Sequence, residues 1–345
     1  MLLTDLLGTR LPVIQAPMAG SQGSRLALAV CEAGGLGSLP TAALGPERLE
    51  EELKALSRVS TGPWNVNAFC HTPPEQDAEQ LRAWHKALAP YYAEFGIDAD
   101  AVPSGAGREP FSHALADVLE PFRPPVVSFH FGLPAPDLLK RVKSWGSVVL
   151  SSATTLEEAR WLEEKGVDAV IAQGLEAGGH RGMFLTHDLT TQMGTLALVP
   201  QLVAALRVPV IAAGGIADAG SAAAARALGA DGVQAGTAFL YCPEADTSAV
   251  HRQALQSDAA RHTALTTIFS GRPARGIVNR LMRELGTLPP EAPAFPLATA
   301  AVAPLRAAAE SRDSGDFSPL WAGQNTSNCR QQPAADVIRT LAEPF

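Results

Sequence analysis

One histidine of this sequence stands where it could take part in catalysis. His180 lies in the string EAGGHRG, residues 176–182, with glycines on both sides. An imidazole with its ordinary pKa of about 6.5 exchanges a proton close to neutral pH. Glycines carry no side chain that would pack around the ring, so we expect His180 to face open space. The string predicts proton transfer or polar contact with a substrate at His180.

Three more polar side chains occur where buried strands are expected to end. His130 ends the run VVSFH, and we predict that it positions a substrate, with a structural role as the alternative. Asn67, two residues after Asn65, and Gln173 place amides where a buried strand favours apolar side chains. Buried amides need hydrogen-bond partners. We therefore predict that Asn67 and Gln173 face a polar ligand.

Two glycine-rich strings predict a phosphate site. AAGGIAD, residues 212–218, and QAGT, residues 234–237, each follow an apolar run. Glycines let backbone N–H groups approach phosphate oxygens, and a threonine adds a hydroxyl donor. Tight turns alone are the alternative for one loop, but two such loops favour phosphate. The residues expected there are Ala213, Gly214, Gly215, Gln234, Ala235, Gly236 and Thr237.

FMN is the cofactor that these strings favour. The sequence contains neither GxGxxG nor GxxxxGK[ST], so a Rossmann dinucleotide site and a P-loop are unsupported. Ala16 and Pro17 could lie flat against one edge of a flavin ring, and Met18 offers a soft apolar contact. The alternative for Met18 is a place in the core of the protein.

A cluster near the C-terminal third could meet the substrate. In SGRPARG, residues 270–276, Ser270 and Arg272 are predicted to contact an anionic substrate. Arginine suits that task because its planar guanidinium binds anions through paired donors. The alternative for the arginines of this string is that they cap helices.

Short apolar runs alternate along the chain with longer segments rich in Ala, Leu and Glu, which is typical of parallel βα units. Eight such strands close a (β/α)8 TIM barrel, whose active site lies at the C-terminal strand ends. The polar residues named above fall at those ends. The expected strands are Val13–Pro17, Leu36–Pro40, Asn65–Phe69, Val126–Phe131, Val148–Ser152, Ala169–Ala172, Val210–Ala213 and Gly232–Ala235.

Helices are expected between the strands, for example at Ser24–Glu32, Leu156–Lys165 and Ser221–Leu228. Hydroxyl groups at Ser24 and at Thr154-Thr155 are placed to cap the first two of these helices.

Two excursions interrupt the barrel pattern. Residues 71–125 look largely helical and stay within an FMN-binding barrel of residues 1–245. Residues 246–285 are predicted to be helical and are followed by the irregular stretch TLPPEAPAFPLATAAVAPL, because proline disfavours regular elements. We expect an additional, mostly helical insertion of residues 246–330 that covers the mouth of the barrel. Residues 331–345 contain a last helix near Ala335–Leu341.

Composition narrows the classes of function. The chain has 345 residues and a formal charge of −8 without a basic run, which argues against nucleic acid or an anionic membrane surface as a partner. The four scattered cysteines form no CxxC pair, so a reducing cytoplasm is expected. His130 and His180 lack a third ligand at a strand end, so no metal is predicted.

Together the motifs resemble the nitronate monooxygenases, formerly called 2-nitropropane dioxygenases, of the bacterial class I type. The matching strings run in order from about residue 13 to residue 324 and so cover nearly the whole chain. They are IQAPMAG, AGGLGSL, WNVNAFCH, VSFHFG, AQGLEAGGHRG, VIAAGGIAD, VQAGTAFL, TALTTIFSGRPARG and WAGQ.

The resemblance implies an FMN-dependent oxidation of alkyl nitronates, of the propionate 3-nitronate type, by O2. Carbonyl compound and nitrite would be the products and detoxification the purpose. His180 takes the catalytic position of the family, and Gly178 and Gly179 join the FMN contacts. A nitronate is already a carbanion equivalent, so His180 acts as a base only on a neutral nitroalkane and otherwise orients the anion.

Two rival interpretations stay open at this stage. An NAD(P)H-dependent quinone or enoyl reductase on the same barrel would share the glycine loops. A flavin-binding barrel without turnover is the second rival, which the cluster of Asn67, His130, Gln173 and His180 disfavours. Monomer and homodimer are equally compatible with the sequence.

Overall fold

Eight parallel strands surround a common core in this protein, which a computed structural model describes over residues 2–102 and 107–345. They follow the order β1-β9-β8-β6-β5-β4-β3-β2. A parallel bridge between Ile14 and Leu36 joins the first strand to the start of the second and closes the ring. The strands are β1 Val13–Gln15, β2 Gly37–Pro40, β3 Trp64–Phe69, β4 Val126–His130, β5 Val148–Ala153, β6 Ala169–Gln173, β8 Val210–Ala213 and β9 Gly232–Ala235.

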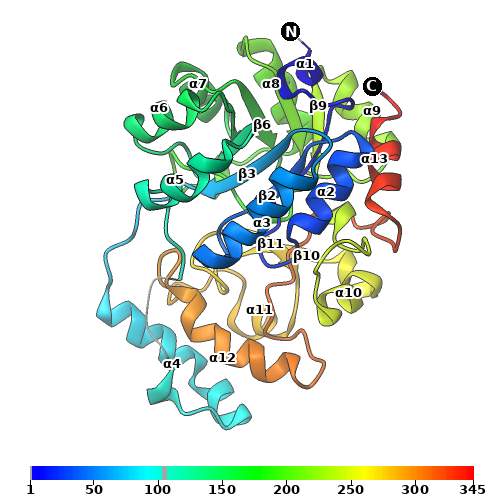
Figure 1. The fold of residues 1–345 in the computed structure, drawn as a ribbon. Helices are drawn as coiled ribbons and strands as arrows, with labels where there is room; N and C mark the ends of the chain where they lie inside the picture. The colour runs from blue at the N-terminus through cyan, green and yellow to red at the C-terminus, as the bar shows by residue number, and fades with distance from the viewer. Residues whose placement is uncertain (1, 103–106) are drawn as a thin grey trace.

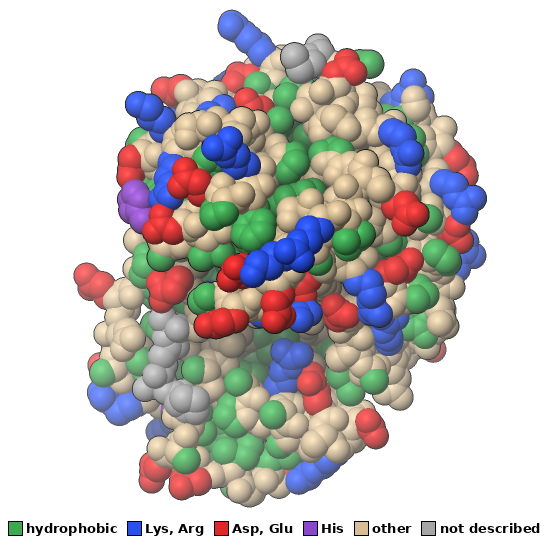
Figure 2. All heavy atoms as spheres, viewed as in Figure 1, with side chains coloured by type: hydrophobic (Ala, Val, Ile, Leu, Met, Phe, Trp, Pro, Cys, Tyr) green, Lys and Arg blue, Asp and Glu red, His purple; other side chains and the backbone are tan. Residues whose placement is uncertain are grey.

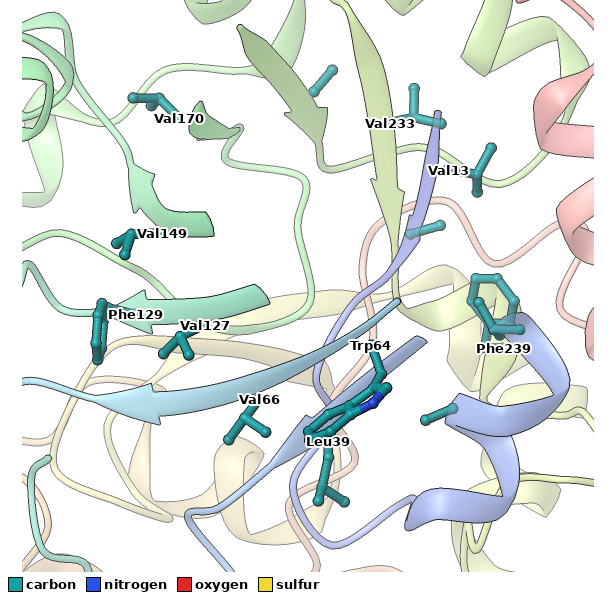
Figure 3. Close-up of a cluster of buried hydrophobic side chains, with 14 of the residues drawn as sticks. Val13, Leu39, Trp64, Val66, Val127, Phe129, Val149, Val170, Val233 and Phe239 are labelled. Carbon is teal, nitrogen blue, oxygen red and sulfur yellow. The ribbon is translucent and has the colours of Figure 1, made fainter. Parts of the chain in front are cut away.

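This confirms the predicted (β/α)8 TIM barrel and all eight predicted strands (Figure 1). Successive residues of a strand point alternately into the barrel and outward toward the helices, so the strands contribute to two apolar layers. Side chains such as Ile14, Leu150 and Ile211 fill the inside of the barrel, where Leu3 and Leu7 of the short helix α1 (Leu3–Leu7) join them. The others pack outward against helices, and Figure 3 labels nine of them together with Phe239, which follows the last barrel strand. A strand that is buried on both faces is mostly apolar, which is why these runs were recognisable despite buried polar residues such as Asn65 and Ser128.

Helices cover the outside of the barrel. They are α2 Ser24–Ala33, α3 Pro46–Val59, α5 His113–Leu119, α6 Pro136–Ser144, α7 Leu156–Glu164, α8 Thr195–Ala205, α9 Ala219–Ala227 and α13 Ala334–Ala342. Thr155 caps α7 as predicted, accepting from the N–H of Glu158 at 3.2 Å. The predicted cap of α2 is wrong, because its N-cap is Gly23 and the N–H of Ser24 donates to the carboxylate of Glu52 instead.

A second group of elements lies below the barrel in Figure 1. It contains α4 Ala78–Phe95, α10 Ala249–Gln256, α11 Arg280–Leu285, α12 Ala298–Glu310 and the strands β7 Gly179–His180, β10 Thr263–Thr266 and β11 Ala274–Ile277. Short 3-10 helices occur at η1 Ala99–Ala101, η2 Glu120–Phe122, η3 Leu189–Thr191, η4 Thr237–Phe239 and η5 Asp258–Arg261. One apolar cluster joins α4 to α11 and α12.

The prediction that residues 246–285 are helical throughout is wrong. Strands β10 and β11 pair antiparallel there, and β11 also pairs with β7, so that Ala274 lies opposite His180. The partner of β11 lies almost a hundred residues earlier in the chain. A local sequence pattern cannot predict a strand that forms because a distant segment pairs with it.

The stretch predicted as irregular also contains a helix, α12, despite Pro304 inside it. Alanines dominate α12 and favour the helix. Its buried face, with Ala301, Val302 and Leu305, packs in the cluster that includes Trp84 and Leu88 of α4. Propensity and tertiary packing together outweigh the missing N–H of one proline.

The last helix, α13, returns to the barrel and packs on α2 with Val337, Ile338 and Leu341 (Figure 1). None of the helices in the described part of the chain combines the length and the apolar character that crossing a bilayer requires.

Candidate functional site

A cavity opens at the C-terminal ends of the barrel strands. In Figure 2 the surface is hollowed between the barrel and the elements below it. The predicted site residues that line the cavity are Ala16, Pro17, Met18, Asn67, His130, Gln173, Gly178, Gly179, His180, Ala213, Gly214, Gly215, Gln234, Ala235, Gly236 and Thr237. The topology thus brings together residues that are more than two hundred positions apart in the sequence.

The two glycine loops present free donors to this cavity. The backbone N–H groups of Gly215, Gly236 and Thr237 donate to no acceptor among the described residues. Gly214 and Gly215 have φ values of 114° and 73°, which L side chains rarely adopt. The hydroxyl of Thr237 accepts from the N–H of Gly323 at 2.9 Å, so its own proton remains available. Such a cluster of donors suits a phosphate.

A segment that the motif analysis did not assign to the site completes this part of the wall. Trp321, Gly323 and Asn325 line the cavity. Asn325 donates to the carbonyl of Gly215 at 3.0 Å and holds the glycine loop from the outside. A Cβ on Gly178 would meet the backbone N of Gly323 at 2.5 Å, so the two segments touch. The only sequence signal was the string WAGQ within the family resemblance.

His180 is enclosed by aromatic rings. Its ring lies 5.3 Å from Phe295, 5.6 Å from Trp321, 5.9 Å from Phe131 and 6.0 Å from Phe69, measured between centroids. Burial, followed by the charge of nearby Arg108, lowers the pKa of His180 well below its usual value. The imidazole is therefore neutral at pH 7, not poised to titrate there.

The cluster at 270–276 lies beside His180 and not on the cavity wall. The hydroxyl of Ser270 and Nε2 of His180 are hydrogen-bonded at 2.8 Å. The guanidinium of Arg272 stacks on Phe131 at 4.0 Å from the ring centroid and donates to the carbonyl of Met183. Ser270 is thus placed to orient the imidazole.

His130 is also held in one orientation. Its Nε2 donates to the backbone carbonyl of His180 at 3.1 Å, and its Nδ1 is hydrogen-bonded to the hydroxyl of Ser152. Burial lowers the pKa of His130 to about 3, so the ring is neutral. A neutral ring that donates through Nε2 must accept at Nδ1 from Ser152.

The predicted polar amides have partners inside the protein. Gln173 donates to the carbonyl of His180 at 2.9 Å and accepts from the N–H of Gly182 at 2.7 Å. Asn67 donates to both the carbonyl and the hydroxyl of Ser128. Gln173 thus holds the loop that carries His180 while it lines the cavity.

Arg181 anchors the same loop and has no counterpart in the sequence-based prediction. Its side chain is fully buried and donates to the carbonyls of Gln173 at 2.8 Å and Gly174 at 2.7 Å, and to Oε1 of Gln192 at 3.0 Å. Burial lowers the pKa of Arg181 to about 10, which still leaves it charged at neutral pH. The guanidinium of Arg181, although it is next to His180 in the sequence, therefore has a structural role: it fixes the loop that carries His180.

Arg108 also lines the cavity and was missed by sequence reasoning. It lines the wall and its guanidinium lies 5.9 Å from the ring centroid of Phe295. An arginine in a long connection between strands β3 and β4 carries no local pattern that would assign it to a site.

Comparisons with known proteins agree with this geometry. The family model described as nitronate monooxygenase matches residues 1–343. The chain is 43% identical to the nitronate monooxygenase of Pseudomonas aeruginosa, over 99% of this chain and 97% of that protein. It is 42% identical to that of Paraburkholderia phytofirmans, over 98% and 93% of the two chains.

Two solved structures are similar to this chain over nearly its whole length. A nitroalkane oxidase from Streptomyces ansochromogenes superposes with a TM-score of 0.89 at 40% identity, covering 99% of this chain and 96% of that one. FabK from Thermotoga maritima is more distant, with a TM-score of 0.72 and 27% identity over 99% and 95% of the two chains. The chain belongs to the nitronate monooxygenase family of oxidoreductases.

Proposed function

We propose that this protein catalyses the FMN-dependent oxidation of alkyl nitronates by O2 to a carbonyl compound and nitrite, and so detoxifies them. The observation that carries the proposal is one cavity that joins the free donors of Gly215, Gly236 and Thr237 to the enclosed His180. Family membership supports the same reaction class.

FMN fits the residues that line the cavity. The free N–H groups and the hydroxyl of Thr237 would hold its phosphate, and the backbone of Ala16–Met18 would border its ring. When bound, FMN accepts electrons from the nitronate and passes them to O2. A Cβ at Gly236 would come within 3.4 Å of the Cβ of Ala16, so a side chain there would narrow the cavity.

His180 would orient the nitronate. The nitronate already carries its negative charge, so no proton has to be removed before it reacts. A neutral imidazole fixed by Ser270 can hydrogen-bond to the substrate without an unfavourable change of charge. The rings of Phe69, Phe131 and Phe295 exclude water from this side of the cavity and strengthen that contact.

A visible spectrum tests the proposal. The purified protein should be yellow, and anaerobic addition of an alkyl nitronate should bleach the flavin band. Admission of air should restore the band and release nitrite. A flavin band that an excess of nitronate leaves unchanged would contradict the proposed reaction.

Thr237→Val tests the phosphate site without any turnover. Loss of one hydroxyl donor to a charged group should weaken FMN binding by about tenfold or more. The dissociation constant can be measured from flavin fluorescence on titration of the FMN-free protein. Thr340→Val, on the outer helix α13, is the matched control and should bind FMN as the unchanged protein does. Equal FMN binding by both variants would show that the hydroxyl of Thr237 does not hold the phosphate.

A reductase that uses NAD(P)H is the second candidate function, because FabK shares this fold at 27% identity. Anaerobic mixing with NADPH separates the two. Rapid bleaching of the flavin by NADPH would favour the reductase, and bleaching by the nitronate alone favours the proposed oxidation.

We further propose that the enzyme works in a reducing cytoplasm as a monomer or homodimer. All four cysteines are free thiols in the structure, which is compatible with a reducing compartment. Light scattering of the purified protein would distinguish the two oligomeric states.

A further inference from the structure

A half-buried positive charge in the cavity wall has no counter-ion among the described residues. Arg108 lines the cavity, and no carboxylate among the described residues lies within ion-pair distance of its guanidinium. The residues outside the described ranges, Met1 and 103–106, carry no acidic side chain. A charge that is partly removed from water and has no partner is unfavourable, so such a group favours an anion that arrives with a ligand.

The position of Arg108 relative to His180 defines where that anion would sit. The guanidinium of Arg108 and the ring of His180 are neighbours of the same phenyl ring, Phe295, at 5.9 Å and 5.3 Å between centres. The charge of Arg108 is also the second cause of the lowered pKa of His180. The two groups are therefore close enough for one small molecule to contact both.

Arg272, a further cation beside His180, is less available to a ligand. Arg272 stacks on Phe131 and donates to the carbonyl of Met183, and it does not line the cavity. Burial, with repulsion from Arg306, lowers the pKa of Arg108, but a guanidinium keeps its proton at neutral pH. Arg108 is thus the charged donor that the cavity presents to a ligand.

We propose that Arg108 binds a carboxylate at the end of the substrate remote from the nitronate group, and so selects nitronates that carry a second negative charge. The inference rests on the proposed function and adds the residue that determines specificity. A guanidinium meets a carboxylate through two parallel N–H donors, which lysine cannot reproduce and glutamine can only in part.

Two nitronates of similar size test the proposal. Propionate 3-nitronate carries a carboxylate where propyl 1-nitronate carries a methyl group. Arg108→Gln should lower kcat/KM for propionate 3-nitronate by about ten- to a hundredfold, mainly through KM, and leave propyl 1-nitronate within about twofold. Arg108→Lys should recover part of the preference because it restores the charge.

Arg306→Gln is the matched control. Arg306 lies on α12, affects Arg108 through its charge and does not line the cavity. The substitution Arg306→Gln removes one positive charge from the same region, as Arg108→Gln does. Because Arg306 does not face the substrate, this substitution should leave the ratio of the two kcat/KM values unchanged. An equal change of that ratio in both variants would assign the preference to the general field and overturn the role of Arg108.

A binding measurement separates failure of this inference from failure of the proposed function. Calorimetric titration with 3-nitropropionate needs no turnover, and Arg108→Gln should weaken its binding by about tenfold or more. If the unchanged enzyme oxidises both nitronates but Arg108→Gln binds and discriminates as before, the inference is wrong and the function stands. If neither nitronate is oxidised but the binding difference is found, the function is wrong and the carboxylate site stands.

Discussion

At the scale of single residues, His180 is defined by what surrounds it. Four aromatic rings and two arginines place a neutral imidazole beside the cavity, with Ser270 fixing its Nε2. A histidine with an ordinary pKa would change charge near neutral pH, whereas this one does not. We therefore propose that it orients a substrate, with proton abstraction needed only for a neutral nitroalkane.

Replacement of His180 by Asn should separate these two roles. His180→Asn should keep FMN but lower kcat/KM for a neutral nitroalkane by about a hundredfold or more, because that substrate must lose a proton. For the corresponding nitronate the loss should stay below about tenfold. Steady-state rates with both substrate forms provide the measurement, and His187→Asn on an exposed loop is the control. Equal losses for both forms would contradict the assignment of proton transfer to His180.

At the scale of elements, the loop after β6 is held from two sides. Strand β11 pairs with β7, and the buried Arg181 joins that loop to the end of β6 and to Gln192. This arrangement makes the position of His180 depend on the second group of elements. The division into residues 1–245, 246–330 and 331–345 stays a prediction, and the cluster of α4 with α12 suggests that α4 belongs with the second of them.

Arg181→Lys should show how much this brace contributes. Lysine cannot reach three acceptors from one side chain, so buried carbonyls lose their donors. We expect the free energy of unfolding to fall by about 3 kcal/mol and nitronate turnover to fall with it. Urea denaturation measures the first effect. Arg160→Lys on the exposed face of α7 is the control, and similar stabilities of the two variants would show that Arg181 is not a brace.

At the scale of the whole molecule, several histidines are buried in the neutral form. Burial lowers the pKa of His71 and of His251 to about 4 and that of His130 to about 3. The unfolded chain binds protons at these groups below about pH 6.5, and the folded chain does not. The stability that these neutral histidines contribute is therefore fully present above about pH 6.5. It is lost as the pH falls toward their lowered pKa values in the folded chain.

This acid sensitivity can be tested at His251, which lies outside the cavity and whose Nε2 donates to the carbonyl of Trp321 at 3.1 Å. Between pH 7 and pH 5 each such histidine contributes at most about 1.4 kcal/mol per pH unit to the slope of stability. His251→Gln should reduce the slope by up to that amount in urea denaturation. His262→Gln, at an exposed position, should leave the slope unchanged, and an unchanged slope in His251→Gln would refute the account.

Much of the fold and of the cavity was predictable because the deciding signals are local. Each barrel strand is a short, mostly apolar run that is buried on both faces, and a parallel barrel collects the C-terminal ends of its strands at one mouth. Residues in or just after the C-terminal halves of the strands, such as Asn67, His130 and Gly215, were therefore assigned to one site, and all three line the cavity.

Contacts between distant parts of the chain were not predictable in the same way. The strand β11 exists because β7 pairs with it, and α12 is a helix that packs against α4. Ser270 is hydrogen-bonded to His180 across ninety positions and so supports the imidazole, while its contact with a substrate stays a prediction. The same holds for Arg108, which no local pattern marks. Whether an arginine braces a loop, as Arg181 does, or faces the cavity, as Arg108 does, depends on which groups the folded chain places around it, and only the tertiary structure decides that.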